Sequence, residues 1–263
     1  MNFRPKPNRI LEALKKGEIP LGMEVNTGNP SIIEILAYTG FDFYMLDMEH
    51  TRLSRETMEY CIRAADAAGI TTIVRVTEND PGLIRHVQEA GAQGVVVPRV
   101  RTPEDVQKII DAFRYGPEGK CGVCPLVRAA NYSDEGYEEY IEYSNRNNMI
   151  IPLLEDKTGF ENAEEIFSLL KPGVDAIGTG MGDLRFSLRK PGQKADRNHP
   201  YIREAIEKVA LLSKKTGIPI MDMAFSPEGV KETIIRGTKI VLYSLDQMLF
   251  YKLCRDIVKA VKG

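Results

Sequence analysis

Short hydrophobic runs recur along the chain, and each is followed by a turn and then by a segment with helical spacing of its apolar residues. Short apolar runs between turns are typical of buried strands, whereas apolar residues three and four positions apart are typical of an amphipathic helix. The helical pattern is clear after Thr102-Pro103, where Val106, Ile109 and Phe113 share one stripe. The alternation predicts repeated β–α units and therefore a parallel sheet.

The pattern contains eight such units. The predicted strands lie at 21–25, 41–46, 71–76, 94–98, 149–154, 175–178, 218–221 and 239–243. Several following helices open with a capping residue and a proline, as at Asn29-Pro30 and Asp80-Pro81. We also expect a helix at 9–16 before the first strand and a last helix at about 246–262. Eight units in 263 residues predict an α/β fold, a single (β/α)8 TIM barrel over 1–263. The segments 114–148 and 185–200 exceed a minimal barrel and are interpreted as walls or a lid over its mouth.

Composition excludes several classes of protein. Charged residues make up 27% and hydrophobic residues 43% of the chain, which allows a sizeable core. The net charge of -2 shows no basic surplus for nucleic acid, and no apolar stretch is long enough for a membrane span. The first residues lack the apolar region of a signal peptide. Four cysteines in this length form no disulfide framework, so we expect a cytoplasmic protein.

Charged residues stand where the hydrophobic runs end. Asp47, Glu49 and His50 follow the second predicted strand, and Arg75 ends the third. Glu155 follows the fifth predicted strand, and Asp183 follows the sixth after a glycine-rich stretch. A TIM barrel gathers the carboxyl ends of its strands on one face, where its active site forms. The sequence therefore predicts two carboxylates, a histidine and an arginine at one mouth, a combination suited to metal-assisted proton chemistry.

Each candidate has a chemical and a structural interpretation. Glu155 and Asp183 follow neighbouring strands and suit Mg²⁺ or Mn²⁺, or they cap helices and pair with surface lysines. His50 beside a carboxylate suits a general base, or it is an ordinary loop histidine. Arg75 suits a substrate carbonyl or carboxylate, or it forms a structural salt bridge. The glycine-rich stretch 178–182 lacks the lysine of a phosphate loop, and the Cys121–Cys124 pair lacks the further ligands of a zinc site.

Several motifs together resemble the HpcH/HpaI aldolase family, whose members are class II pyruvate aldolases. The matching strings are Gly40-Phe41-Asp42-Phe43, Leu46-Asp47-Met48-Glu49-His50, Val74-Arg75, Asn79-Asp80-Pro81, Glu89-Ala90-Gly91-Ala92-Gln93-Gly94, Arg114-Tyr115-Gly116-Pro117, Leu154-Glu155 and Gly180-Met181-Gly182-Asp183-Leu184. They come in the family's order and cover most of the chain.

The resemblance implies a role for each candidate. Glu155 and Asp183 would hold a divalent cation, Mg²⁺ or Mn²⁺ with Co²⁺ as an alternative. Arg75 would hold the keto oxygen of pyruvate, and the backbone at Gly182 and Asp183 would hold its carboxylate. His50 would be the acid/base through a water on the cation, with Asp47 in the same catalytic cluster. The acid that orients the histidine matches Glu89. The resemblance further implies a homohexamer, a trimer of dimers that exchange the C-terminal helix.

The implied activity is cleavage or formation of 4-hydroxy-2-oxoacids through a pyruvate enolate, with an aldehyde as the second small-molecule partner. Alternatives are a decarboxylase or lyase that acts on oxaloacetate-like acids, a CoA-thioester lyase, and a catalytically silent barrel that binds small acids. A Schiff-base aldolase is disfavoured because no lysine ends a predicted strand.

Some positions depart from the family pattern. Leu153 stands for glutamine, and Glu89 stands for aspartate. Met181, Gly182 and Arg185 stand for proline, alanine and serine. Arg185 would either contact an anionic substrate or point to solvent. These departures leave the acceptor aldehyde open.

Overall fold

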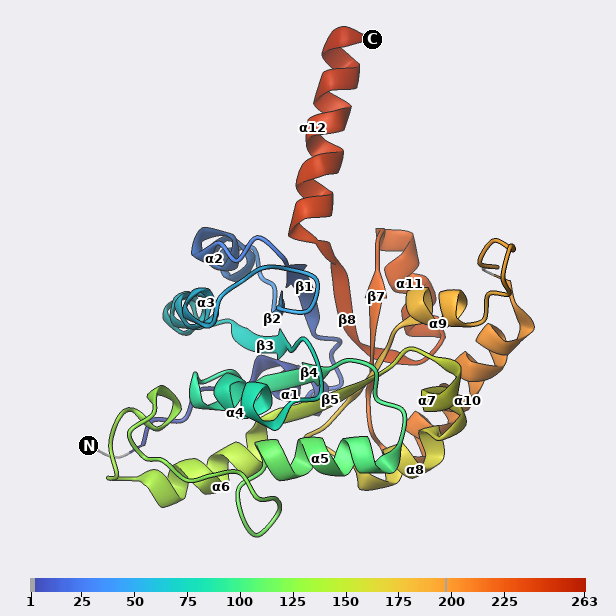
Figure 1. Cartoon of the computed structure of the whole chain (residues 1–263). Helices are drawn as coiled ribbons and strands as arrows, with labels where there is room; N and C mark the ends of the chain where they lie inside the picture. The colour runs from blue at the N-terminus through green and yellow to red at the C-terminus, as the bar shows by residue number, and fades with distance from the viewer. Residues whose placement is uncertain (1–2, 197) are drawn as a thin grey trace.

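Eight parallel strands close into one barrel in the computed structural model, which describes residues 3–196 and 198–263 (Figure 1). The strands pair in sequence order, and β8 closes the barrel against β1. They are β1 (Leu21–Val25), β2 (Phe43–Asp47), β3 (Thr71–Arg75), β4 (Gly94–Val97), β5 (Met149–Leu154), β6 (Ile177–Thr179), β7 (Ile220–Ala224) and β8 (Thr238–Leu245). This arrangement confirms the predicted TIM barrel.

Helices accompany the strands, and most of them pack on the outer face of the barrel. They are α1 (Arg9–Lys15), α2 (Pro30–Tyr38), α3 (Arg55–Ala68), α4 (Pro81–Glu89), α5 (Pro103–Phe113), η1 (Arg128–Ala130), α6 (Tyr137–Asn147), α7 (Lys157–Glu161), α8 (Ala163–Leu169), α9 (Met181–Ser187), α10 (Pro200–Thr216), α11 (Pro227–Ile235) and α12 (Asp246–Lys262). The N-terminal helix α1 appears where the sequence predicts it. The short helices α7 and α9 and the helix α6 lie in segments for which no helix was predicted.

The segment 114–148 does not lie over the mouth, which corrects the interpretation made from the sequence. Its last part is α6, which leads directly into β5, so the segment lies at the amino ends of the strands. Asn8, which caps α1, donates to the carbonyl oxygen of Asn147 at 2.8 Å and ties the segment to α1. The described residues of the segment 185–200, namely 185–196 and 198–200, lie between β6 and α10 on the side of the mouth, because α9 follows the carboxyl end of β6.

Apolar side chains fill both the inside of the barrel and the layer between the strands and the helices. Phe43, Met45, Ile73, Ile151 and Met221 belong to the inner group. The strands are buried on both faces, and they therefore read as continuous apolar runs in the sequence. Two charged side chains interrupt the inner group at the mouth, Glu24 on β1 and Arg75 on β3.

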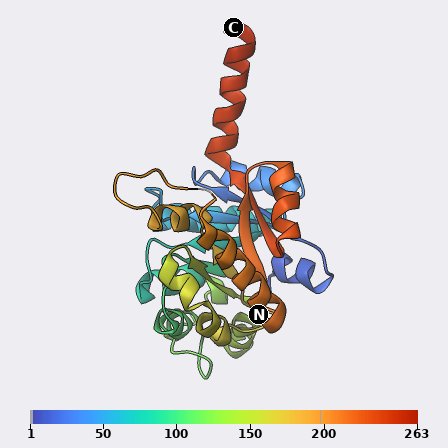
Figure 2. The same ribbon diagram turned by 90° about the vertical axis from the view of Figure 1, so that its right-hand side faces the viewer.

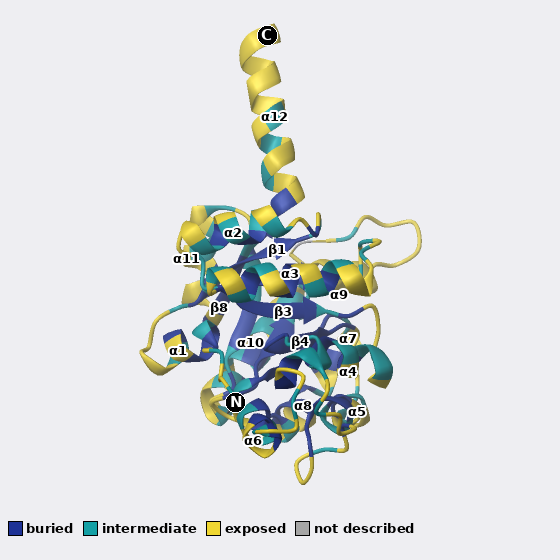
Figure 3. Cartoon of the chain, turned by 90° about the vertical axis from the view of Figure 1, so that its left-hand side faces the viewer, coloured by how far each residue is buried: buried dark blue, intermediate teal, exposed yellow. Residues whose placement is uncertain are grey.

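Helix α12 stands clear of the barrel in two perpendicular views (Figure 2). Most of its length is exposed, whereas the strands are buried (Figure 3). Its first residue, Asp246, is buried and accepts hydrogen bonds from the backbone N–H groups of Asn26 and Thr27. Large apolar side chains farther along are exposed, among them Phe250, Tyr251 and Val261. No helix in the described ranges is both long enough and apolar enough to cross a membrane.

Candidate active site

A cavity of about 270 Å³ opens at the carboxyl ends of the strands. Its polar wall comes from several strands and from the start of α9, whereas methionines, leucines, a valine, a phenylalanine and two glycines form the rest. The polar lining consists of Glu24, Arg75, Glu155, Thr179, Asp183 and Asp222. The cavity therefore gathers Arg75, Glu155, Gly182 and Asp183, four of the residues singled out in the sequence.

Arg75 is held by carboxylates at the mouth. Its Nε donates to Oδ1 of Asp47 at 2.8 Å, and its Nη2 donates to Oε1 of Glu24 at 3.2 Å. A third carboxylate, that of Glu49, lies 3.6 Å from Nε. These neighbours compensate the charge of the guanidinium where its side chain is only 13% exposed. Asp47 is fully buried and also accepts from the backbone N–H groups of Glu49 and His50, so it fixes both the arginine and the turn that carries the histidine.

Glu155 is a buried carboxylate directly after β5. Its Oε1 accepts a hydrogen bond of 2.7 Å from the backbone N–H of Arg99. Burial, together with the nearby charges of Glu49 and Asp183, raises the pKa of Glu155 to about 7. A bound cation would offset both effects, because it supplies the positive charge that this carboxylate lacks.

Gly180 allows the chain to pass close to Glu155. A Cβ at this position would lie 2.5 Å from the Cβ of Glu155, closer than two carbon atoms approach. The absence of a side chain thus brings the start of α9, with Asp183, next to Glu155. α9 has no side-chain cap, so the N–H groups of Gly182 and Asp183 have no acceptor within the helix.

His50 lies at the rim and does not line the cavity. Its side chain is 64% exposed, and its Nε2 lies 3.7 Å from Oε2 of Glu49. The other oxygen of Glu49 lies 3.3 Å from Nη2 of Arg99. The carboxylate beside His50 in this chain is therefore Glu49.

Glu89 is not brought to His50, contrary to what the resemblance implies. It is the last residue of α4, and helices run antiparallel to the strands, so it lies near the amino end of β4 and not at the mouth. It lies near two residues of its own helix, with 3.7 Å to Nε of Arg85 and 3.8 Å to Nδ1 of His86. The motif match placed Glu89 in the catalytic set. Within one chain, however, Glu89 lies away from the mouth and from His50.

Thr179, Asp222 and Glu24 line the cavity but were not singled out in the sequence, and Glu24 is the one of them that contacts Arg75. It lies within the apolar run of β1, and its side chain points into the cavity with 3% exposure. Burial raises the pKa of Glu24 to about 7, and Arg75 acts in the opposite direction. A carboxylate at an inward-facing strand position is costly without a partner, and that cost is the signal that could have found it.

The donor set fits a hard divalent cation. In the part of the chain that the structure describes, no three His, Cys, Asp or Glu side chains group closely enough to hold a metal ion by themselves. Two carboxylates, Glu155 and Asp183, would leave the other positions to water and to oxygen atoms of a substrate. Mg²⁺ and Mn²⁺ accept such mixed oxygen shells, whereas a structural zinc site requires four protein ligands.

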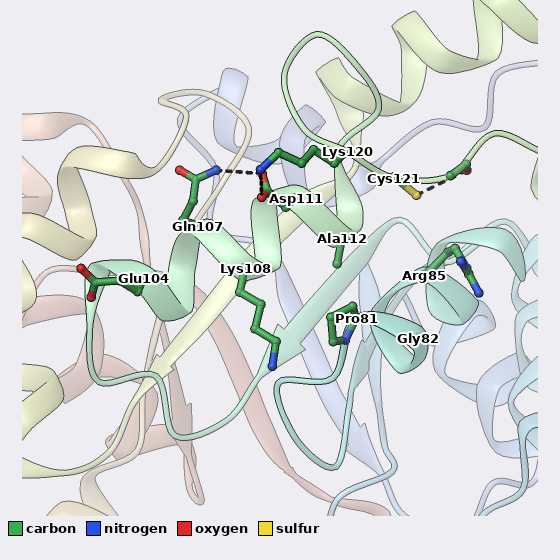
Figure 4. A pocket seen from close by; sticks show the side chains of 11 residues that line it. Pro81, Gly82, Arg85, Glu104, Gln107, Lys108, Asp111, Ala112, Lys120 and Cys121 are labelled. Atoms are coloured by element: carbon green, nitrogen blue, oxygen red, sulfur yellow. Dashed lines mark hydrogen bonds and ion pairs between the residues drawn. The ribbon is translucent and has the colours of Figure 1, made fainter.

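A second cavity, of about 540 Å³, lies on the outer surface (Figure 4). Arg85 of α4 and Lys108 of α5 line it together with Glu104, and Lys120 pairs with Asp111 at 2.5 Å. Charges of both signs alternate there, and none of the residues of the mouth lines it. Cys121 at its edge is buried and donates to Oε1 of Gln88, whereas Cys124 is exposed; both are free thiols.

Comparison with known proteins agrees with this geometry. The family model of HpcH/HpaI aldolase/citrate lyase matches residues 21–252, nearly the whole barrel. The chain belongs to this family. It is thus an enzyme of an aldolase and lyase family, and the resemblance found in the sequence is confirmed.

Relatives of known activity and solved structure cover almost the whole chain. The 2-dehydro-3,6-dideoxy-6-sulfogluconate aldolase of Pseudomonas putida is 30% identical over 95% of both chains. The 2-keto-3-deoxy-L-rhamnonate aldolase of Escherichia coli K12 is 28% identical over 92% of this chain and 89% of the relative. A family protein from Burkholderia cenocepacia J2315 superposes with a TM-score of 0.86 at 27% identity, covering 98% of this chain and all of the other. Citrate synthase SbnG gives a TM-score of 0.83 at 27% identity, covering 96% of each chain.

Proposed function

We propose that the protein is a divalent-cation-dependent aldolase that cleaves or forms 4-hydroxy-2-oxoacids, with pyruvate as the common product or donor. The observation that carries the proposal is the cavity itself, where two adjacent carboxylates, Glu155 and Asp183, face the guanidinium of Arg75. The printed names of the relatives, both aldolases of deoxy sugar acids, agree with this class of reaction.

Glu155 and Asp183 would hold the cation, Mg²⁺ or Mn²⁺. When bound, such a cation polarises the keto group of a 2-oxoacid and stabilises the negative charge that develops on its oxygen. Arg75 would donate to the same oxygen from the opposite wall of the cavity. The free N–H groups of Gly182 and Asp183 would bind the carboxylate of the acid. These contacts would orient the methyl group of pyruvate, or the bond to be cleaved, toward the rim.

His50 would move the proton. Its exposed position at the rim, beside Glu49, allows it to act through an ordered water, and a neighbouring carboxylate stabilises the imidazolium that forms. In the cleavage direction the histidine would take the proton of the 4-hydroxyl group as the carbon–carbon bond breaks. The pyruvate enolate left by the cleavage would take up a proton at its methylene carbon. In the reverse direction the histidine would remove a proton from the methyl group of pyruvate and deliver it to the aldehyde oxygen, which becomes the new hydroxyl group.

The exposed α12 supports an assembly of several copies. Its apolar side chains have no cover within the chain, and a second subunit would bury them. We propose a homo-oligomer, in the family's manner a hexamer, in which α12 packs on a neighbour.

The experiment that tests the activity measures pyruvate release from a panel of 4-hydroxy-2-oxoacids, each with Mg²⁺, with Mn²⁺ and after exhaustive chelation. Oxaloacetate belongs in the panel, because the similarity to a citrate synthase makes an oxaloacetate-like acid the second candidate. Cation-dependent release of pyruvate with an aldehyde supports the aldolase. Release of carbon dioxide from oxaloacetate alone supports the decarboxylase and contradicts the aldolase.

A further inference from the structure

The carboxylate of Glu24 has no role in the reaction described so far. It is 3% exposed, it lies inside the barrel on β1, and it faces the cavity that holds Glu155 and Asp183. Its Oε1 lies 3.2 Å from Nη2 of Arg75. A carboxylate is rarely buried in such a position without a partner, because removing its charge from water costs free energy that only an ion pair or hydrogen bonds can offset.

We propose that Glu24 is a positioning residue of the lyase site: together with Asp47 it holds the guanidinium of Arg75 from two sides and leaves one amino group, Nη1, for one oxygen of the substrate. The inference rests on the proposed function, because it concerns how Arg75 meets the keto oxygen.

Two of the three nitrogen atoms of the Arg75 guanidinium already donate hydrogen bonds within the protein. Nε is occupied by Asp47 at 2.8 Å and Nη2 by Glu24 at 3.2 Å, and these two bonds fix the plane of the guanidinium. Among the described residues Nη1 has no hydrogen-bond partner. It is also absent from the side-chain atoms that are buried without a partner, so it is open to the cavity. Arg75 therefore presents a single free donor group.

The charges around Arg75 also support the proposal. Asp47 is fully buried, and the side chain of Glu49 is 10% exposed, with Oε2 at 3.6 Å from Nε. With Glu24, three carboxylates surround one guanidinium, so the arginine brings no net positive charge to the cavity. An arginine that binds a carboxylate group usually offers a two-donor edge and an uncompensated charge. In Arg75 the carboxylates already occupy the two-donor edge and compensate the charge. This suits a directed hydrogen bond to one developing oxyanion, and the carboxylate of the acid would bind to the backbone at the start of α9.

Two variants separate positioning from a merely structural role. Glu24→Ala removes the acceptor and frees Nη2, so the guanidinium can turn about its Nε–Cζ bond. We expect kcat for pyruvate release to fall about tenfold. KM should not rise, because the freed Nη2 can pair with the carboxylate of the substrate. Glu24→Gln keeps an acceptor at the same place without the charge, so it should recover most of the lost kcat.

A double-mutant cycle shows whether the effect passes through Arg75. In an Arg75→Lys background the loss caused by Glu24→Ala should shrink to less than about twofold, because residues that act as one unit are not additive. Additive losses would show that Glu24 acts elsewhere and would overturn the proposal. A rise in KM with unchanged kcat would also overturn it.

Rotation about the Nε–Cζ bond of Arg75, measured by ¹⁵N NMR with Arg75→Lys to assign the signal, tests the clamp without turnover. We expect slow rotation in the wild-type protein and faster rotation in Glu24→Ala. Met223→Ala is the matched control: it enlarges the same cavity but keeps Asp47 and Glu24, the hydrogen-bond partners of Arg75, and should leave the rotation slow. Equal rotation in wild type and Glu24→Ala overturns the proposal. If the wild-type protein releases no pyruvate from any substrate, the proposed function fails. The rotation measurement then still tests whether Glu24 holds the guanidinium of Arg75 in place.

Discussion

At the scale of single residues, the mouth of the barrel is organised around Arg75. Asp47 and Glu24 hold its guanidinium, and Glu155 and Asp183 lie in the same cavity. The arrangement combines one directed hydrogen-bond donor with a pair of carboxylates suited to a cation. Each part has its own chemistry, and each can be removed separately.

Arg75→Lys should lower kcat/KM for retro-aldol cleavage about ten- to a hundredfold, although it keeps the charge. Lysine cannot reproduce the fixed fork of donors, and it would leave buried Asp47 or Glu24 without a partner, at a cost of about 1–3 kcal/mol. The measurement uses saturating cation, with the fold checked by circular dichroism. A lysine variant within about twofold of wild type would reduce Arg75 to a source of diffuse charge.

His50→Ala should impair proton transfer more than binding. General base catalysis contributes about 10²–10⁴-fold, so deuterium exchange into the methyl group of pyruvate should slow by at least about a hundredfold. The affinity for Mn²⁺ should stay the same, because Glu155 and Asp183 are untouched. His86→Ala, on α4 and away from the mouth, is the matched control. Wild-type exchange in His50→Ala would refute the assignment.

At the scale of elements, the turn between β6 and α9 sets the distance between the two carboxylates. Gly180→Ala places a Cβ 2.5 Å from the Cβ of Glu155, and neither atom is the end of a flexible side chain. We expect weaker Mn²⁺ binding and a lower Tm, because Glu155 or the turn must shift. Gly182→Ala, two residues on, meets nothing within 4 Å and should keep both the fold and the cation affinity. Equal cation affinities in the two variants would contradict the role given to Gly180.

The strands and their order could be predicted from the sequence because periodicity and caps encode them directly. Asn29-Pro30 and Asp80-Pro81 cap their helices as predicted. Strand bounds shift by a few residues where side chains decide the pairing. β6, for instance, begins at Ile177, because Asp175 is engaged by Arg114 and by backbone N–H groups.

The site could be predicted in part. Arg75, Glu155 and Asp183 follow strands, and the topology of a barrel brings strand ends together. Glu24 was missed because its partner lies far along the chain and no motif marks it, although a carboxylate inside the apolar run of β1 is itself a sign of a buried partner. Glu89 was assigned by a motif match alone, and the pattern does not record that the end of α4 lies at the opposite face. The segment 114–148 was misplaced because its length alone suggested a wall of the mouth, and length does not tell at which end of the strands a segment lies.

In the molecule as a whole, α12 extends from a compact barrel (Figure 1). Large apolar side chains of this helix are exposed. Phe250 is 69% exposed and Val261 is 77% exposed. Exposing such large apolar side chains to water is unfavourable for a single subunit. An assembly that buries α12 would explain them.

Phe250→Asp should therefore lower the molecular mass measured by sedimentation, because it introduces a charge into the proposed contact between subunits. Lys259→Asp changes a charge on the same helix and is the control, expected to keep the assembly. If the wild-type protein sediments as a monomer, the proposed oligomer is wrong. Unchanged assembly in Phe250→Asp would show that α12 is not the contact.

In the proposed reaction the cavity activates the methyl group of pyruvate with the help of a cation held by Glu155 and Asp183. The most direct test follows the methyl signal of pyruvate by proton NMR in D₂O, with the protein as isolated, after exhaustive chelation and after return of Mg²⁺ or Mn²⁺. We expect exchange that stops on chelation, returns with the cation and is absent in a folded Glu155→Ala variant. Exchange that continues at the same rate without a cation, or that never occurs in the metal-loaded protein, would contradict the proposed reaction.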